Sequence, residues 1–249
     1  YDVWTQELDR AEKRRQWRPH FYIFTRGGGH TGLPQFLISF HRVDTSSDLN
    51  AYVSRLSLLD TAMDQLLARA QTAAARGIRP PAFAFEQASS EVARLTTGAP
   101  FGRGADSPLF ADVKAKAAGL VKQGAMTDAD AKAAVDRAAT VLKTEVKPAY
   151  DRIAAWLRDD GRNASAESQG VSALPEGGAF YNVALALQTT TAMTSEEIHA
   201  LGLSEVARIR AEMEAVKTAT GFAGTLPEFF AFMRKDRRFF FPNTDAGRA

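Results

Sequence analysis

The sequence predicts a mainly α, multi-helical globular domain with long antiparallel helices. Three observations lead to this fold class: apolar residues recur every three or four positions over long stretches, helix-capping residues precede several of these stretches, and strands do not alternate with helices. The composition agrees, because 45% of the 249 residues are hydrophobic and 24% are charged, which is ordinary for a soluble globular protein. We therefore expect one helical domain over residues 1–249.

The N-terminal part of the chain combines a helix with a segment of a different character. Residues 1–18 carry an apolar stripe among charged residues, so we expect a helix that Pro19 terminates. Residues 20–43 hold two short aromatic and β-branched runs on either side of the glycine-rich stretch RGGGHTGLPQ, residues 26–35. We expect residues 20–43 to form a short extended, Gly-rich segment, either as strands or as segments packed into a core.

The central part of the chain begins with the longest predicted helix. It follows a cap at Ser46 or Ser47, its apolar residues are spaced by three and four, and Gly77 stops it. Shorter helices are expected over residues 85–95 and 108–124.

The rest of the chain is also predicted to be helical. Residues 128–157 predict a long helix that Pro148 should kink, because proline removes a backbone donor. The polar loop at residues 160–173 is a candidate sub-boundary. Residues 194–220 and 225–233 each begin with a capping box, in which a threonine and a glutamate three positions later bind each other's backbone N–H groups.

The stretch RGGGHTGLPQ is the first candidate site. A phosphate-binding P-loop is not predicted, because no lysine follows the glycines before Phe36. The spacing of Gly27, Gly29 and Gly32 matches a bare dinucleotide fingerprint, but Pro34 argues against the helix that such a site needs. What remains is a backbone bend in which the glycines approach either neighbouring helices or a ligand.

The four histidines do not form a metal-binding motif. A zinc-hydrolase helix of the thermolysin type needs two histidines four residues apart with a glutamate between them, and no such pair occurs. Half of that pattern precedes His199, for which we favour a structural role. We expect His20 and His41 to form local hydrogen bonds. His30 is the one histidine in a glycine-rich loop, where functional residues are common.

A complete catalytic constellation is not visible in the residues. The Gly-x-Ser-x-Gly pattern of a nucleophilic serine is absent, and nearly all acidic residues lie on the polar faces of predicted helices. Tyr181 follows two glycines at the start of an apolar helix. Its side chain either packs in the core, which we favour, or directs its hydroxyl group into a cavity.

Charge and cysteine content exclude several classes of partner and chemistry. The 31 basic and 29 acidic residues give a net charge of +2, so no nucleic-acid partner is expected. The absence of cysteine excludes disulfides, thiolate nucleophiles and Cys-ligated metals. No apolar stretch approaches the roughly 20 residues that span a bilayer. We expect both ends to be cuts in a longer chain, so the compartment, cytoplasmic or exported, stays open.

Several short motifs occur in a fixed order along the chain. They are Tyr22-x(6)-Gly29-His30-x-x-Leu33-Pro34-x-Phe36, His41, Tyr52-x-x-Arg55-Leu56, Gly77-Ile78-x-Pro80-Pro81, Leu174-Pro175-x-Gly177-x-x-x-Tyr181 and Thr194-x-Glu196-Glu197-Ile198-His199. This order resembles a bacterial family catalogued as domain of unknown function 885. The resemblance covers nearly the whole chain and is most specific over EEIHALGLSEVARIRAEME, residues 196–214.

The resemblance implies a longer, largely helical protein. Members of the family carry His-Glu-x-x-x-Gly-His-His, a variant of the zinc-hydrolase helix, in their C-terminal half. The resemblance therefore implies a metallopeptidase-like hydrolase, in which zinc polarises a carbonyl group and activates water. No position of this chain matches a metal ligand of the family, so no metal and no cofactor is assigned to this segment, and zinc is expected for the full-length parent.

Two hypotheses follow from the sequence. In the first, the chain is the non-catalytic N-terminal and middle portion of a zinc-dependent peptidase-like hydrolase and forms walls of the cleft for a peptide-like substrate. Its partner is then the missing C-terminal half or another chain, and His30, Tyr181, Gly28 and Gly29 are the candidate residues at the cavity. The rival hypothesis is a free-standing helical binding or scaffold protein with no metal centre. A missing half of a cleft should leave a wide apolar surface.

Overall fold

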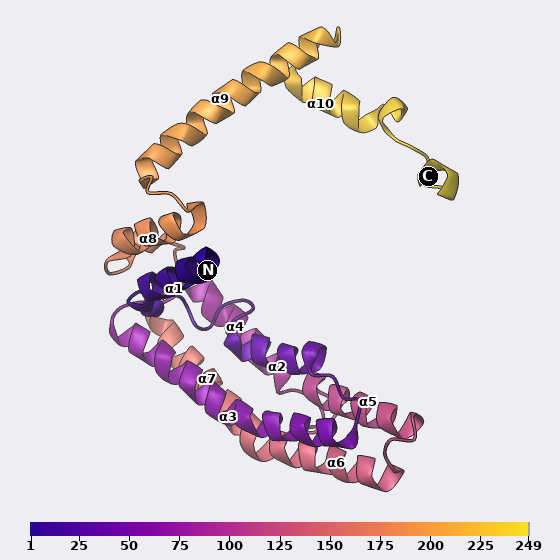
Figure 1. Ribbon diagram of the computed structural model, residues 1–249. Coiled ribbons are helices and arrows are strands. Elements are labelled where there is room, and N and C mark those ends of the chain that lie inside the picture. The colour runs from indigo at the N-terminus through magenta and orange to yellow at the C-terminus, as the bar shows by residue number, and fades with distance from the viewer. Residues whose placement is uncertain (249) are drawn as a thin grey trace. The chain divides into compact units, whose positions relative to one another are not determined.

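The computed structural model describes residues 1–248, and Figure 1 shows that it is built from helices. No strand occurs among the described residues. The predicted mainly α, multi-helical fold class is confirmed. The chain divides into two compact units, Tyr1–Val183 (unit 1) and Ala184–Ala249 (unit 2).

Unit 1 holds seven helices of ten or more residues and the first part of an eighth. They are α1 (Asp2–Arg15), α2 (Gly29–Phe40), α3 (Ser46–Ala75), α4 (Ala82–Leu95), α5 (Pro108–Lys122), α6 (Asp128–Val141), α7 (Lys147–Asp160) and the start of α8 (Gly177–Thr189). The predicted sub-boundary at residues 160–173 lies inside unit 1, whereas the division between the units falls within α8.

Helix α3 is the central element of unit 1. One face of it is buried along its length, from Leu49 to Ala74, and this face packs against α2, α6 and α7. The N-cap of the helix is Thr45, one residue before the first of the two predicted caps, and Thr45 forms a capping box with Asp48. Gly77, with a φ of 76°, ends it as predicted. Helices α5 and α6 are joined by a short turn and lie side by side in opposite directions (Figure 1).

The long helix predicted over residues 128–157 is interrupted where Pro148 affects it. Helix α6 passes into a five-residue π-helical turn, Leu142–Val146, and α7 starts immediately afterwards, with Pro148 in its first turn. Pro148 has no N–H group with which to continue the α-helical ladder. The wider turn before it accommodates that missing bond. The structure thus places a π-helical interruption directly before Pro148, where the sequence predicted a kink.

Helix α2 was not predicted. We expected an extended segment over residues 20–43, but residues 29–40 are helical, and Pro34 lies inside the helix. A proline there leaves the carbonyl group four residues earlier, that of His30, without its helical donor. The hydroxyl group of Tyr150 on α7 donates to the His30 carbonyl oxygen instead, at 2.5 Å. A long-range hydrogen bond therefore replaces the backbone bond that Pro34 cannot form, and the helix tolerates the proline.

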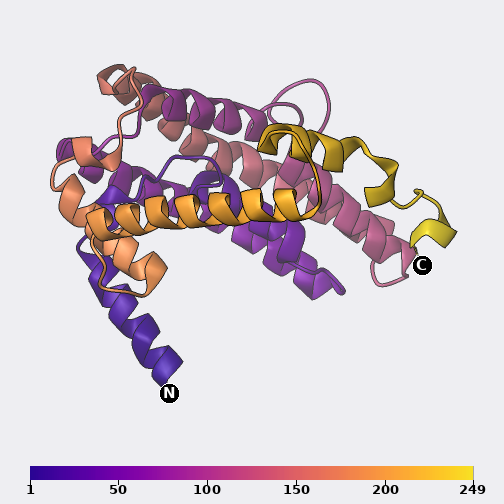
Figure 2. The same ribbon diagram turned by 90° about the horizontal axis from the view of Figure 1, so that it is seen from above.

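Unit 2 contains the remainder of the described chain. Its helices after α8 are α9 (Ser195–Ala219), α10 (Leu226–Lys235) and α11 (Asp245–Arg248). Both predicted capping boxes are present, at the starts of α9 and α10. Figure 2 shows α9 as one unbroken helix, after which the chain turns back into α10. Among residues 1–248, no helix combines the length and apolar character that crossing a membrane requires.

Candidate functional site

The glycine-rich stretch forms the tight entry into α2. Gly27 has a φ of 72°, and Gly28 is the N-cap of the helix. A Cβ atom on Gly28 would lie 2.5 Å from the carbonyl oxygen of Ile23, and one on Gly29 would lie 2.8 Å from the Leu66 side chain on α3. The neighbours that the glycines approach are therefore protein atoms of unit 1. The sequence left open whether the glycines approach neighbouring helices or a ligand. In the structure they approach the protein itself.

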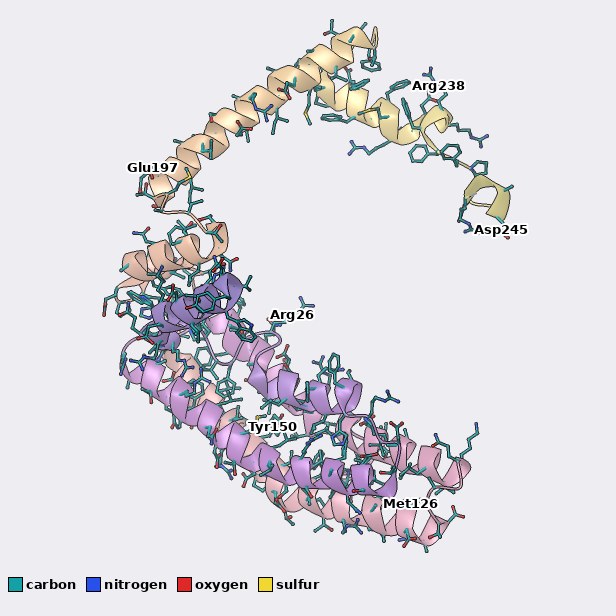
Figure 3. The ribbon with its side chains drawn as sticks, in the orientation of Figure 1. Arg26, Met126, Tyr150, Glu197, Arg238 and Asp245 are labelled. Carbon is teal, nitrogen blue, oxygen red and sulfur yellow. The ribbon has the colours of Figure 1, made fainter. Side chains whose placement is uncertain are left out.

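His30 is enclosed beneath this bend. Its side chain is completely buried, and its Nε2 atom lies 2.9 Å from Oε2 of Glu91 on α4. Because a carboxylate only accepts, Nε2 carries the hydrogen of this bond. Phe24 packs edge-on against the imidazole ring. Tyr150 binds the His30 carbonyl oxygen, and Figure 3 shows Tyr150 among the side chains enclosed by the helices of unit 1.

The electrostatics of this cluster favour a neutral histidine. Burial lowers the pKa of His30, and the nearby Glu91 carboxylate opposes this shift without overcoming it. The Nδ1 atom of His30 has no hydrogen-bond partner among the described residues. A doubly protonated ring would therefore leave a buried donor unsatisfied. The His30–Glu91–Tyr150 cluster ties α2, α4 and α7 together.

The other histidines have different environments. His41 accepts from Arg55 at Nδ1 (2.7 Å) and donates from Nε2 to the Asp48 carbonyl oxygen (3.2 Å), as predicted for a local role. Burial, followed by Arg55, lowers the pKa of His41. The prediction for His20 is wrong, because its Nε2 atom binds the carbonyl oxygen of Pro175, 155 positions away. His199 lies exposed on α9.

The candidate residues taken from the sequence do not all meet. Gly28, Gly29 and His30 lie together at the start of α2. Tyr181 lies on α8 with 45% of its surface exposed, so the expected core packing is wrong within the described residues. No group of three or more His, Cys, Asp or Glu side chains within residues 1–248 is arranged to hold a metal ion. The cluster around His30 stabilises the fold and offers no open access for a substrate.

An open apolar groove lies instead in unit 2, between α9 and α10. It encloses about 740 Å³. Its walls are aromatic and aliphatic, and they include Ile209, Met213, Val216, Phe222, Phe229 and Phe232. Glu212 and Arg238 contribute charges to the lining. The sequence shows apolar spacing along the helices that became α9 and α10, but periodicity does not reveal whether a stripe is covered.

Helix α9 is the exposed wall of this groove. None of its 25 residues is buried. Its apolar stripe is open to solvent: the exposed fraction is 50% for Leu201, 41% for Met213 and 58% for Val216. In a folded protein such a stripe normally faces another element. The groove between α9 and α10 is thus the best candidate for a binding surface in the described chain.

Comparisons with known proteins identify related sequences and a related fold. A family model described as "Bacterial protein of unknown function (DUF885)" matches residues 1–249. A crystal structure described as that of "the putative lipoprotein from Colwellia psychrerythraea" is similar, with a TM-score of 0.72 and 22% sequence identity. The match covers 91% of this chain but only 38% of that chain. No curated protein matches.

Proposed function

Because the chain belongs to the family of bacterial proteins of unknown function DUF885, we propose that it is the non-catalytic N-terminal and middle portion of a longer helical hydrolase. In this proposal unit 1 is a stable scaffold. The α9–α10 groove of unit 2 binds a further helical segment of the same protein. The whole protein is a metal-dependent, peptidase-like hydrolase, and this portion forms walls of its substrate cleft.

One observation carries the proposal: α9 is a helix of 25 residues without a buried side chain. Helical propensity alone stabilises such a helix weakly in water, and packing of the apolar face normally supplies the rest. Exposed contiguous apolar surface of this kind is typical of a site that another polypeptide covers. The sequence hypothesis of a missing half also expects such a surface.

The proposed occupant of the groove is an amphipathic helix. The lining is mainly apolar, with Phe and Met side chains that adapt to a helical partner. Glu212 and Arg238 give it one charge of each sign. A segment with an apolar stripe and mixed charges beside it would be complementary. The length of the similar solved chain, of which this chain covers 38%, supports the existence of such a segment in the parent.

The chemistry of the parent is proposed from the family resemblance. A zinc ion in the C-terminal half would polarise the scissile carbonyl group and activate water, and a glutamate would accept the proton of that water. The present chain would position the substrate and enclose it between the walls of the cleft. His30, Gly28 and Gly29 would act indirectly, because they fix the start of α2, whereas Tyr181 has an exposed side chain that can face a substrate.

The test compares the 249-residue chain with the longer protein. We expect the 249-residue chain to purify without stoichiometric zinc and to leave peptides uncleaved, whereas the protein from the full reading frame binds zinc and cleaves them. The chain should also bind a separately produced C-terminal portion, and Met213→Asp should weaken that binding. Ala211→Asp, on the opposite face of α9, is the matched control. Tightly bound zinc or peptide cleavage in the 249-residue chain alone would refute the proposal.

The rival hypothesis, a free-standing helical binding or scaffold protein, uses the same groove. It predicts that the natural reading frame stops at Ala249 and that the groove binds a helix from another protein. A reading frame that continues into a His-Glu-x-x-x-Gly-His-His motif would decide for the hydrolase.

A further inference from the structure

A trough lies in unit 1, away from the α9–α10 groove and from the His30 cluster. One wall is the face of α3 that carries Ala68, Arg69, Thr72 and Ala73, and the other is the 3-10 turn Arg18–His20 with the loop that follows it. The turn and the helix pack against each other. The trough encloses about 350 Å³, within the range of roughly 300–1,000 Å³ that is typical of ligand sites.

Most of the trough surface is apolar. Pro19 and Ile23 line one wall, and Ala68 and Ala73 line the other. Thr72 adds a hydroxyl group, but this group already donates to the carbonyl oxygen of Ala68, at 2.8 Å. The small alanine side chains of α3 leave the space between the walls open. A ligand that fills this space therefore needs an apolar body, whose burial removes apolar surface from water on both sides.

The remaining lining residues are two arginines, with Arg18 on the turn and Arg69 on α3. Of the described residues that line the trough, none is acidic. Within residues 1–248 neither guanidinium group forms an ion pair or a hydrogen bond with the protein. Both side chains are exposed, so their charged ends are free to turn toward an anion at the mouth of the trough. A carboxylate is suited to this position, because guanidinium groups form strong, charge-assisted hydrogen bonds with it.

A narrower apolar space shares Pro19, Ile23 and Ala73 with the trough. Phe24 and Trp156 are among its other walls. Its volume of about 20 Å³ exceeds the roughly 10–15 Å³ that one water-sized group needs, so it has room for a methyl group and none for an aromatic ring. The shape of the two spaces together favours a slim, unbranched chain over a bulky ring.

From these features we propose that the trough binds an unbranched alkyl carboxylate, which is a fatty acid of medium length. The alkyl chain lies between the two apolar walls, and the carboxylate pairs with Arg18 and Arg69. At the roughly 30 Å³ that a water molecule occupies in the liquid, a volume of about 350 Å³ holds about twelve non-hydrogen atoms, the size of decanoate. Binding is non-covalent, and the site does not depend on the proposed hydrolase activity.

Titration calorimetry with decanoate tests the chemical class of the ligand. We expect the 249-residue chain to bind decanoate saturably, with a dissociation constant of about 1 mM or below. Decylammonium has the same chain with the opposite charge, and hexanoate has the same charge with a shorter chain. Each should bind at least about tenfold more weakly than decanoate. No saturable binding of decanoate, or equal binding of decylammonium, would overturn the proposal.

The position of the bound chain has to be measured as well, because the α9–α10 groove is also apolar. In a ¹H–¹⁵N spectrum, decanoate should shift the backbone amide signals of Ile23 and Thr72, which line the trough. The amide signals of Val216 and Phe229, which line the groove, should stay in place. Saturable shifts confined to Val216 and Phe229 would place the fatty acid in the groove and refute the site in unit 1.

Surface variants test the two arginines. Arg18→Gln and Arg69→Gln should each weaken decanoate binding about tenfold, because each removes a charge-assisted bond. Arg94→Gln, an exposed arginine on α4 outside the trough, is the matched control and should leave binding unchanged. Unchanged binding in both Arg18→Gln and Arg69→Gln would contradict recognition of a carboxylate.

A larger side chain on α3 tests the trough itself. Ala68→Leu fills the space between the walls and leaves both arginines in place, so it should weaken decanoate binding at least about tenfold. Ala51→Leu, at another exposed alanine of α3 outside the trough, is the matched control. Equal weakening by the two leucine variants, or by neither, would show that the alkyl chain does not lie in the trough.

Discussion

At the scale of single residues, the bond between Tyr150 and the His30 carbonyl oxygen has a defined energetic role. Pro34 cannot donate to that oxygen, so Tyr150 is its donor. Tyr150→Phe should therefore lower the free energy of unfolding by about 1–3 kcal/mol, because it leaves a buried acceptor unsatisfied. In a Pro34→Ala background the new backbone N–H can reach the same oxygen. There we expect Tyr150→Phe to cost clearly less, as measured by urea denaturation.

This double-mutant comparison isolates the hydrogen bond from the packing of the ring, which phenylalanine preserves. Tyr181→Phe is the control, since Tyr181 is 45% exposed, and it should change stability by less than about 0.5 kcal/mol. An equal cost of Tyr150→Phe in the unmodified chain and in the Pro34→Ala background would show that the hydroxyl group stabilises the fold in another way.

His30 links stability to pH. Burial holds its pKa below the ordinary histidine value of about 6.5, so the unfolded chain takes up a proton more readily than the folded one. The stabilising contribution is complete above pH 6.5 and is lost as the pH falls toward the lower folded pKa. His41, whose pKa is lowered too, acts in the same direction. Each histidine adds a slope of up to about 1.4 kcal/mol per pH unit in this window.

The slope of stability against pH tests this directly, because it does not depend on the absolute stability of a variant. His30→Gln should reduce the loss of unfolding free energy between pH 7 and 5, because it removes the contribution of His30 and leaves that of His41. Ser204→Ala, which removes an exposed side chain without a titratable group from α9, should leave the slope unchanged. A His30→Gln variant with the same slope as the parent would mean that His30 has an unshifted pKa.

At the scale of elements, the start of α2 depends on close backbone contact. Gly28→Ala would bring a methyl group within 2.5 Å of the Ile23 carbonyl oxygen and 3.0 Å of that of Thr25. Relief of this overlap should cost about 1–3 kcal/mol. Gly178→Ala is a matched change near the start of α8, where no atom lies within 4 Å, and it should be neutral or stabilising by up to about 1 kcal/mol. Thermal unfolding of the two variants compares them, and equal melting temperatures would contradict the tight-contact interpretation.

The elements that the sequence predicts are those determined by local interactions. Helix α3 follows from apolar spacing, and α9 and α10 follow from capping boxes whose partners are three residues apart. Helix α2 was missed because its tolerance of Pro34 depends on Tyr150, which lies 120 positions after the His30 carbonyl group that it binds. The Glu91 partner of His30 is likewise 61 positions away. Non-local pairs of this kind leave no periodic signal, so a single sequence does not reveal them.

The candidate site was predictable only in part for the same reason. The glycines of the stretch at residues 26–35 were correctly singled out as a bend, and the apolar stripes of α9 and α10 were visible as patterns. Whether a stripe is buried depends on what packs on it, and periodicity does not reveal that. The structure leaves Met213 and Val216 of the α9 stripe exposed within the described chain.

At the scale of the whole molecule, the two units differ in how their helices are stabilised. Helix α3 buries a complete face, whereas α9 buries no residue. Backbone amides of α9 should therefore exchange with solvent far faster than those of α3 in the 249-residue chain. Hydrogen exchange measured by mass spectrometry compares them in one sample. Equal protection of α9 and α3 would show that the 249-residue chain already covers the stripe, for instance by self-association.

The same contrast predicts how one substitution behaves in two contexts. In the 249-residue chain Met213 is 41% exposed, so Met213→Asp should change the free energy of unfolding by no more than about 0.5 kcal/mol. In the longer protein we propose that a helix covers Met213, and an aspartate buried there without a partner should cost at least about 2 kcal/mol. Ala211→Asp should have a small effect in both. A penalty confined to the longer protein requires an occupant of the groove. No penalty in either protein would mean that α9 remains uncovered.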